Sequence, residues 1–448
     1  MHTPARAQRL FGSMRALLVL HLPLLAVAIS SWTKVTLDLS AHPKAVCLDG
    51  SPGAFYISRG ADPRMILHIQ GGGWCLTDDD CLQRAQPSYS PYPGQPSLGS
   101  SLQWAPTGCA AGSAAGSAAG SAAGAPLPAP VCVADGGDNG MISADPAISQ
   151  FANWTKIFLG YCSGDSFAGA AEAPIVVNAS AQYYFRGRYI LDATIDTALN
   201  SHGLATAPAV ILKGCSAGGM AVFFAADRLR ARIAAANPGA TIVAAPGAGA
   251  ILHAPSLAGG YILDPGLQWL WATANMSGSA PAACLAAVAD AHLCFYPQVS
   301  LLHRGDGAAP LFVANSLADL AQATAVMGLG CDPNTAGACS PAQLAYLNDF
   351  RVRMLAALAP VLAADEGGAW LPECFVHVLE DDTYEWSGVT VTGQTQRDTF
   401  AAWWAARSGG AAPAGLLAKA VDGGWTRNGT SNPSCPQNTA GGAARWLL

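Results

Sequence analysis

The sequence Ala209-Val-Ile-Leu-Lys-Gly-Cys-Ser-Ala-Gly-Gly-Met-Ala-Val-Phe-Phe224 decides the fold. Its apolar, β-branched start is typical of a buried strand, and the good helix formers from Met220 to Arg232 predict a helix. Between them Gly214-Cys-Ser-Ala-Gly218 matches G-x-S-x-G. Strand, glycine turn and helix together predict a nucleophile elbow, whose tight turn raises the Ser216 hydroxyl above the sheet and aims the helix N-terminus at it. The alternative is a glycine–serine turn without a chemical role.

The composition is that of a globular chain with a sizeable core. Of the 448 residues, 51% are hydrophobic and 12% are charged, which argues against general disorder. The length suits one large α/β domain or two small ones. The net charge is −6, and no basic run occurs beyond the first residues, so we expect no nucleic-acid partner.

Residues 1–31 have the pattern of a secretory signal peptide. Three arginines among the first fifteen residues form a basic start, Leu17–Ile29 is apolar, and Ala26-Val-Ala28 supplies small residues at a cleavage spacing. The apolar run is too short and too broken to predict stable membrane insertion. We therefore expect a secreted, extracellular or cell-wall protein with residues 32–448 as its mature chain. An uncleaved signal anchor is the alternative.

Cysteines and glycosylation motifs agree with export. Thirteen cysteines are spread through the chain, and most of them should pair in an oxidising compartment. The odd count leaves one thiol over, for which Cys215 is our candidate. No CxxC pair with histidine partners occurs, so we expect no metal. Local spacing permits three short disulfides, which would join Cys75 to Cys81, Cys284 to Cys294 and Cys331 to Cys339. Four sequons predict glycosylation at Asn153, Asn178, Asn275 and Asn428.

A second informative stretch is Met65-Ile-Leu-His-Ile-Gln-Gly-Gly-Gly-Trp74, an apolar strand pattern that runs into three glycines. An ester hydrolase must stabilise an oxyanion with backbone N–H groups, and a glycine loop after a strand lets bare amides approach it. We assign this role to the N–H groups of Gly72, Gly73 and Ala217. A phosphate-binding loop is the alternative, but neither Lys-Ser/Thr nor a G-x-G-x-x-G spacing follows.

The remaining patterns place these motifs in an α/β fold. Residues 45–60 predict a hairpin with a Pro-Gly turn, residues 153–161 a strand, and residues 190–199 a helix that leads to the elbow strand. This order predicts a mostly parallel sheet with helices on both faces. Residues 105–130, which contain Ala-Ala-Gly-Ser repeats and a Pro-rich end, have little to bury and predict a flexible surface insertion.

An activated serine needs a base and a group that orients the base. In hydrolases with this elbow, the order along the chain is serine, acid, histidine. Residues 310–319 form a buried-strand pattern that ends in a loop with Asp319, and His377 is the only histidine that follows. Chain order therefore selects His377 as the base if Asp319 is the acid. The alternatives are a solvated loop aspartate and a surface histidine.

Segments spread over most of the mature chain, in the same order, resemble the pectin acetylesterases and their animal relatives, the Notum carboxylesterases. They include Gln70-Gly-Gly-Gly-Trp-Cys75, Gly214-Cys-Ser-Ala-Gly-Gly219, Cys374-Phe-Val-His377 and residues 45–53, 151–167, 315–322 and 339–355. The resemblance implies an α/β-hydrolase fold with disulfide-pinned loop insertions and a secreted serine esterase without a cofactor. It assigns Ser216 as nucleophile, Asp319 as acid and His377 as base, and the three amides named above as oxyanion donors.

The chain departs from the plant family members at positions that bear on the substrate. Plant members usually have Glu where this chain has Gln70, Asp-Ala-Gly where it has residues 247–249, and Cys where it has Val378. They have aromatic residues where Ala318 and Ala321 stand.

We predict a single, monomeric α/β-hydrolase domain that removes acetyl groups from a pectin-like or other extracellular polysaccharide, its expected partner. Two alternatives stay open. One is a Notum-like carboxylesterase that removes a fatty acyl group from a protein, and the other is a non-catalytic cell-wall glycoprotein. An acetyl group requires a shallow pocket, whereas a fatty acyl chain requires a deep apolar one.

Overall fold

The computed structural model describes residues 32–89, 97–102, 104–105, 131–132, 140–335, 337–378, 383–423 and 432–435. The predicted signal segment, nearly all of the predicted insertion at 105–130 and the sequon at Asn428 lie outside these residues. The strands β4 (Trp104–Ala105) and β5 (Val131–Cys132), which pair with each other, stand at the two ends of the insertion.

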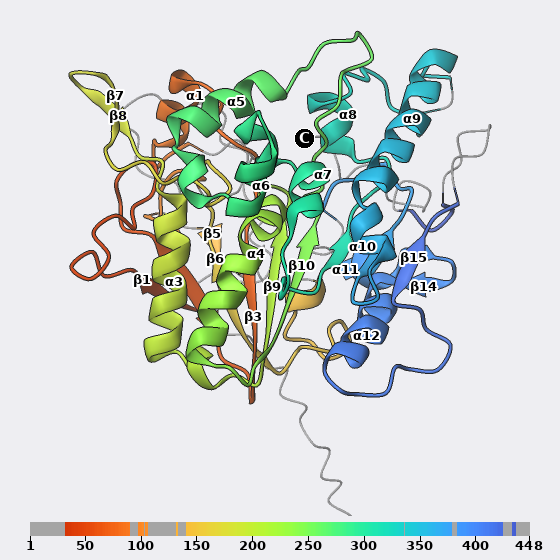
Figure 1. The fold of residues 1–448 in the computed structure, drawn as a ribbon, viewed down its shortest axis with the longest axis horizontal. Helices are drawn as coiled ribbons and strands as arrows, with labels where there is room; N and C mark the ends of the chain where they lie inside the picture. The colour runs from red at the N-terminus through yellow and green to blue at the C-terminus, as the bar shows by residue number, and fades with distance from the viewer. Residues whose placement is uncertain are drawn as a thin grey trace, which may run out of the picture.

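A nine-stranded sheet forms the centre of the molecule, in the order β1-β2-β6-β3-β9-β10-β11-β12-β15 (Figure 1). In chain order its strands are β1 (Thr33–Thr36), β2 (Ala54–Ser58), β3 (Asp62–Ile69), β6 (Trp154–Leu159), β9 (Ala209–Cys215), β10 (Thr241–Gly247), β11 (Phe312–Ala314), β12 (Gly368–Leu371) and β15 (Lys419–Val421). The pairs β1–β2 and β2–β6 are antiparallel, and the pairs from β6 to β15 are parallel. The predicted mostly parallel sheet is confirmed.

The hairpin predicted over residues 45–60 is wrong. β2 pairs instead with β1, upstream of that stretch, and residues 45–53 form a loop closed by one bridge between Val46 and Pro52. A disulfide from Cys47 to Cys162 ties this loop to the end of β6. The Cys47–Cys162 disulfide and the pairing of β2 with β1 therefore outweigh the local preference of the Pro-Gly sequence for a turn.

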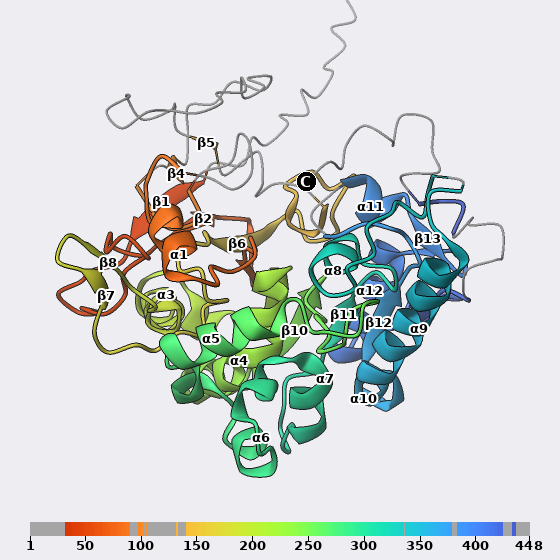
Figure 2. The ribbon, with the colours of Figure 1, turned by 90° about the horizontal axis from the view of Figure 1, so that it is seen from above.

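Successive residues of the buried strands face two different cores. In β9, Val210 and Leu212 pack in the core that contains Met220 of α4 (Ala217–Ala236), whereas Ile211 packs in the core that contains Trp403 of α12 (Gln396–Arg407). The helices α3 (Gly187–Ser201) and α4 lie on one side of the sheet, and α11 (Thr383–Ser387) lies on the other (Figure 2). The predicted placement of helices on both faces is confirmed.

The remaining helices are short, apart from α9. They are α1 (Asp78–Arg84), α5 (Asp264–Thr273), α6 (Ala282–Ala287), α7 (Pro297–Ser300), α8 (Leu320–Ala325), α9 (Pro341–Ala357) and α10 (Ala359–Ala363). α9 begins with a capping box, in which Ser340 accepts a hydrogen bond from the Gln343 amide and the Gln343 side chain accepts one from the Ser340 amide.

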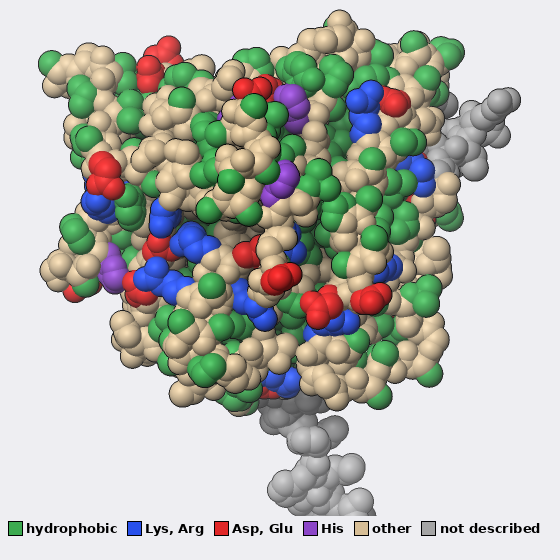
Figure 3. Space-filling model, viewed as in Figure 1, with side chains coloured by type: hydrophobic (Ala, Val, Ile, Leu, Met, Phe, Trp, Pro, Cys, Tyr) green, Lys and Arg blue, Asp and Glu red, His purple; other side chains and the backbone are tan. Residues whose placement is uncertain are grey.

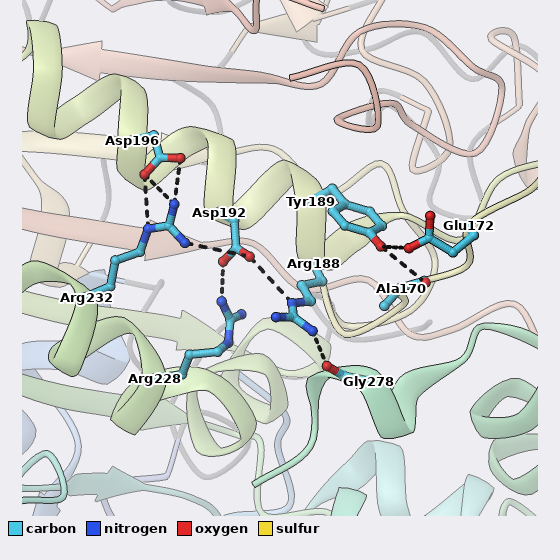
Figure 4. Close-up of polar contacts among 9 residues, drawn as sticks. All are labelled: Ala170, Glu172, Arg188, Tyr189, Asp192, Asp196, Arg228, Arg232 and Gly278. Carbon is cyan, nitrogen blue, oxygen red and sulfur yellow. Dashed lines mark hydrogen bonds and ion pairs between the residues drawn. The ribbon is translucent and has the colours of Figure 1, made fainter. Parts of the chain in front are cut away.

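Ion pairs join α3 to α4 on the outer face of the molecule (Figure 4). Asp192 of α3 lies between three guanidinium groups, those of Arg188, Arg228 and Arg232. Arg232 also donates three hydrogen bonds of 2.5, 2.6 and 3.0 Å to Asp196. Since the two helices cover the same face of the sheet, these pairs fix one helix against the other.

The surface carries both signs of charge in close mixture. On the face shown in Figure 3, acidic and basic side chains lie close together in a band across the middle, and apolar side chains are scattered over the whole face. Within the described part of the chain, no helix has the length and apolar character needed to cross a bilayer.

Disulfides close several of the connecting loops. Among the described residues, the bonds are Cys47–Cys162, Cys75–Cys81, Cys284–Cys294, Cys331–Cys339 and Cys374–Cys435. Three of them are the short pairs that local spacing permits. Cys215 is buried at the end of β9 and takes part in none of these five bonds.

Candidate active site

The predicted elbow forms between β9 and α4. Ser216 is the one residue between them, and its backbone has φ 54° and ψ −124°, a conformation that costs free energy for any residue except glycine. The Ser216 amide donates a 2.9 Å hydrogen bond to the carbonyl of Gly247 at the end of β10. The neighbouring strand thus supports the strained turn, and Ser216 is left partly exposed.

The glycines of the elbow are required by close backbone packing. A Cβ atom on Gly214 would lie 2.3 Å from the carbonyl oxygen of Gly218, and one on Gly218 would lie 2.1 Å from that of Ile69. A Cβ on Gly219 would lie 2.2 Å from the carbonyl oxygen of Gly247. Because backbone atoms cannot move aside as flexible side chains can, these positions exclude every other residue type.

The structure brings Ser216, Asp319 and His377 together at the carboxyl end of the parallel strands. Ser216 follows β9, Asp319 follows β11, and His377 follows β12. Nε2 of His377 lies 2.7 Å from Ser216 Oγ, and Nδ1 lies 2.9 Å from Asp319 Oδ2 and 3.1 Å from Oδ1. The Asp319 side chain is fully buried and that of His377 is 14% exposed, so neither is a solvated surface group.

The surroundings of Asp319 fix the tautomer of His377. Asp319 is the N-cap of α8, and its Oδ1 accepts a 3.0 Å hydrogen bond from the Gln322 amide. A carboxylate accepts hydrogen bonds and donates none, so the proton of the neutral imidazole belongs on Nδ1. Nε2 is then the acceptor for the Ser216 hydroxyl.

The loop that carries His377 is tied down on both sides. The disulfide Cys374–Cys435 joins it to the C-terminal part of the chain, and the hydroxyl of Ser316 donates to the Cys374 carbonyl. Since Ser316 lies on the segment between β11 and Asp319, the same contact couples the histidine loop to the aspartate loop.

The glycine loop lies against the elbow. A Cβ on Gly71 would lie 2.8 Å from Ser216 Cβ and 3.1 Å from the Ala217 nitrogen. Gly72 and Gly73 both have positive φ, 146° and 65°. In the described part of the chain, the amides of Gly72, Gly73 and Ala217 donate no hydrogen bond to another protein group. The three predicted donors thus belong to two segments that touch beside Ser216.

Two side chains that sequence reasoning missed hold the carbonyls of this loop. Arg84 Nη1 donates a 2.9 Å hydrogen bond to the Gly72 carbonyl, and Tyr161 Oη donates one of the same length to the Gly73 carbonyl. Burial raises the pKa of Tyr161, which keeps its phenol protonated as a donor. Fixing the Gly72 carbonyl fixes the peptide plane that contains the Gly73 N–H, and fixing the Gly73 carbonyl fixes the next plane, which contains the N–H of Trp74. The one signal for Tyr161 was its place at the end of a predicted strand.

The departures from the plant pattern have structural roles here. Oε1 of Gln70 accepts a 2.8 Å hydrogen bond from the Tyr161 amide. Gly247, which stands where plant members have Asp, accepts the hydrogen bond of the Ser216 amide through its carbonyl and packs against Gly219 of α4. Ala318 is buried beside Asp319.

A second buried acid lies near the site but outside the serine–histidine–aspartate group. Asp165 accepts hydrogen bonds from the Ser163 hydroxyl and from the amides of Gly169 and Gly187. Burial raises its pKa to about 6. It holds the loop after β6 against the start of α3. No set of three or more His, Cys, Asp or Glu side chains among the described residues is placed to hold a metal ion.

A mostly parallel sheet with a serine elbow after β9, an aspartate after β11 and a histidine after β12 defines the α/β-hydrolase class. A solved structure of the Wnt deacylase Notum from Drosophila has this fold: it superimposes with a TM-score of 0.70 at 21% identity, over 91% of this chain and 99% of that one. The pectinacetylesterase family model matches residues 29–118 and 137–432. The chain therefore belongs to the pectinacetylesterase family.

Relatives of two kinds are similar to this chain. Pectin acetylesterase 11 of Arabidopsis thaliana is 28% identical over 388 residues, which cover 83% of this chain and 87% of that protein. Pectin acetylesterase 7 of the same plant is 28% identical over 358 residues, or 77% and 79% of the two chains. The palmitoleoyl-protein carboxylesterase NOTUM of Homo sapiens is 26% identical over 196 residues, which cover 43% of this chain and 31% of that protein.

Proposed function

We propose that this protein is a serine esterase that removes acetyl groups from a pectin-like extracellular polysaccharide. The observation that carries the proposal is the continuous hydrogen-bonded path from Ser216 Oγ through His377 to Asp319, with distances of 2.7 and 2.9 Å. Such a path is what a serine needs in order to act as a nucleophile at neutral pH.

Each residue has one role in the proposed reaction. Ser216 Oγ attacks the acetyl carbonyl, and His377 Nε2 accepts the serine proton as the Oγ–C bond forms. The imidazolium that results is stabilised by the Asp319 carboxylate. When the carbon–oxygen bond to the sugar breaks, His377 returns the proton to the departing hydroxyl. A water molecule then repeats the sequence on the acetyl-serine and releases acetate.

The amides of Gly72, Gly73 and Ala217 are the proposed donors to the oxyanion. The bracing of the Gly72 carbonyl by Arg84 supports this role for the Gly73 amide, because a donor held in place before the reaction needs no reorganisation during it. Ala217 adds the first amide of α4, whose helix dipole also favours negative charge at its N-terminus.

The acetyl group and the polysaccharide are proposed as the substrate because of the relatives that match this chain. The two pectin acetylesterases match over 77% or more of this chain, whereas human NOTUM matches over 43%. Secretion is part of the proposal, and the five disulfides support it because such bonds persist in oxidising compartments. Glycosylation remains a prediction, with Asn153, Asn178 and Asn275 on exposed sites.

The test compares 4-nitrophenyl esters of acetate, butyrate and palmitate, together with acetate release from acetylated pectin. We expect turnover of the acetyl ester and of pectin, and loss of both in Ser216→Ala. Ser201→Ala, which removes an exposed hydroxyl at the end of α3, is the matched control. Preference for palmitate would favour removal of a fatty acyl group, and no turnover of any ester would favour a non-catalytic glycoprotein.

A further inference from the structure

The segment between β10 and α5, residues 248–263, borders the candidate site on the side of the acid. The Leu252 amide donates a 2.9 Å hydrogen bond to Oε1 of Gln322, the residue whose own amide bonds Asp319. Further along, a Cβ on Gly328, just beyond α8, would lie 2.8 Å from Ile262 Cδ1. The segment therefore packs against the helix that Asp319 caps.

The same segment reaches the side of the glycine loop where it enters α5. A Cβ on Gly266 would lie 2.9 Å from Leu76 Cδ1, and Leu76 follows the three glycines by only three residues. Residues 248–266 thus run from the acid side of the site to the oxyanion side. A polymer whose ester lies at Ser216 would meet this segment as it leaves the site.

Tyr261 forms a flat platform on this segment. Its ring lies parallel to that of His253, with 4.4 Å between centroids and 13° between planes. His253 is itself held in place, since its amide donates to Oε1 of Gln298 and its Nε2 lies 3.4 Å from Asp264 Oδ2. Tyr261 is nonetheless 46% exposed. One face of the ring is therefore covered by His253, and the exposed surface of Tyr261 lies on the rest of the side chain.

We propose that Tyr261 stacks against a pyranose ring of the substrate chain, some distance along from the ring that carries the ester. Pyranose rings present C–H groups on their faces and hydroxyl groups at their edges, so they pack on aromatic faces and bond to polar groups at the rim. This subsite rests on the proposed action on a polysaccharide.

The number of residues between the elbow contact at Gly247 and the platform at His253 fits such a subsite. Gly247 accepts the hydrogen bond of the Ser216 amide, and His253 follows Gly247 by six residues. The Cα atoms of Gly247 and His253 are therefore at most about 22 Å apart. Leu257 and Ile262 are also exposed beside the platform. A lipid surface would use those apolar side chains but would gain nothing from a ring fixed flat by His253, and for this reason the sugar is favoured.

The test measures kcat/KM on acetylated polysaccharide relative to kcat/KM on 4-nitrophenyl acetate. Covering the exposed surface of the ring removes on the order of 50 Å² of apolar surface from water, which corresponds to about a tenfold change in affinity. We expect this ratio to fall about tenfold in Tyr261→Ala through a higher KM, to stay near the wild-type value in Tyr261→Phe, and to fall in Tyr261→Leu. Leu302→Ala, which truncates another exposed apolar side chain, should not change the ratio.

Other outcomes overturn the subsite. An equal loss on both substrates would show a structural role for Tyr261, and a wild-type ratio in Tyr261→Leu would show that no flat ring is needed. Retention in polysaccharide-containing gels, measured with Ser216→Ala as the background, separates the subsite from the proposed function. If the wild type cleaves only the small ester, the proposed substrate is wrong, yet retention that weakens with Tyr261→Ala would still support the subsite. Retention that does not change in Tyr261→Ala would refute the subsite. A variant that loses binding only to anionic phospholipid vesicles, and not to the polysaccharide, would refute it as well.

Discussion

Replacement of Asp319 by Asn changes one atom and should inactivate the enzyme through the tautomer of His377. In the native structure, Oδ1 of Asp319 accepts the Gln322 amide proton and the carboxylate accepts the Nδ1 proton of His377. An asparagine has one carbonyl oxygen for these two donors. If that oxygen keeps the α8 cap, the NH2 group faces Nδ1, and the imidazole proton must move to Nε2. Nε2 then donates to Ser216 and cannot accept its proton.

The expected loss is about 10⁴-fold in kcat, the size seen when the same exchange forces the wrong tautomer in a serine protease, and it corresponds to about 5.4 kcal/mol in the barrier. Stability should change far less. The cap that costs about 0.5–2 kcal/mol to remove is kept in Asp319→Asn and lost only in Asp319→Ala.

The assay is kcat on 4-nitrophenyl acetate, with a thermal melt of each variant. Asp306→Asn, which neutralises an exposed aspartate, is the matched control and should match the wild type in both measurements. The reasoning fails if Asp319→Asn keeps more than about a tenth of the wild-type kcat, a difference of only about 1.4 kcal/mol. It also fails if the melting temperature falls as far in Asp319→Asn as in Asp319→Ala.

Further predictions concern stability and the roles of single groups. Ser216→Ala should abolish acetyl-ester turnover with little change in melting temperature, because the removed hydroxyl is partly exposed and leaves no core cavity. Asp192→Asn should lower the free energy of unfolding by about 1 kcal/mol without changing kcat, since it weakens a partly exposed α3–α4 ion network. Asp165 has a folded-state pKa of about 6, above its ordinary value of 3.8, so the stability that its protonated form contributes is lost as pH rises through 6. The melting temperature of Asp165→Asn should therefore exceed that of the wild type at about pH 8, and the difference should vanish towards about pH 4. Deletion of residues 110–124 should leave melting temperature and kcat unchanged, because the pairing of β4 with β5 lies outside the deletion; a large drop in either would contradict the predicted insertion.

The fold and the elbow could be predicted because their signals are local. A strand, a glycine turn and a helix stand together around Ser216, and the close contact of Gly218 with Ile69 shows why the glycines are needed. His377 could be selected only from chain order, because the sequence around it contains no pattern that predicts contact with Ser216, 161 positions away.

What the sequence did not reveal depends on contacts between distant segments. Arg84 and Tyr161 orient the glycine loop from α1 and from the end of β6, and neither belongs to a motif. The incorrect prediction of a hairpin over residues 45–60 has the same origin. β2 pairs with β1 over four residue pairs, whereas residues 45–53 form a single bridge between Val46 and Pro52. The stack of Tyr261 on His253 needs a loop conformation that no periodicity encodes.

The disulfide between Cys374 and Cys435 has a consequence for biosynthesis. Ser216 and Asp319 are translated well before His377, and the bond that anchors the histidine loop needs a residue 61 positions beyond Cys374. The chain up to His377 can therefore be complete while the loop that carries the base still lacks its disulfide anchor. Esterase activity would then mature late, after translation has passed Cys435 and the oxidative machinery has joined the two thiols. A chain made in a reducing cytosol would test this order directly, because it should fold its sheet and still lack an anchored base.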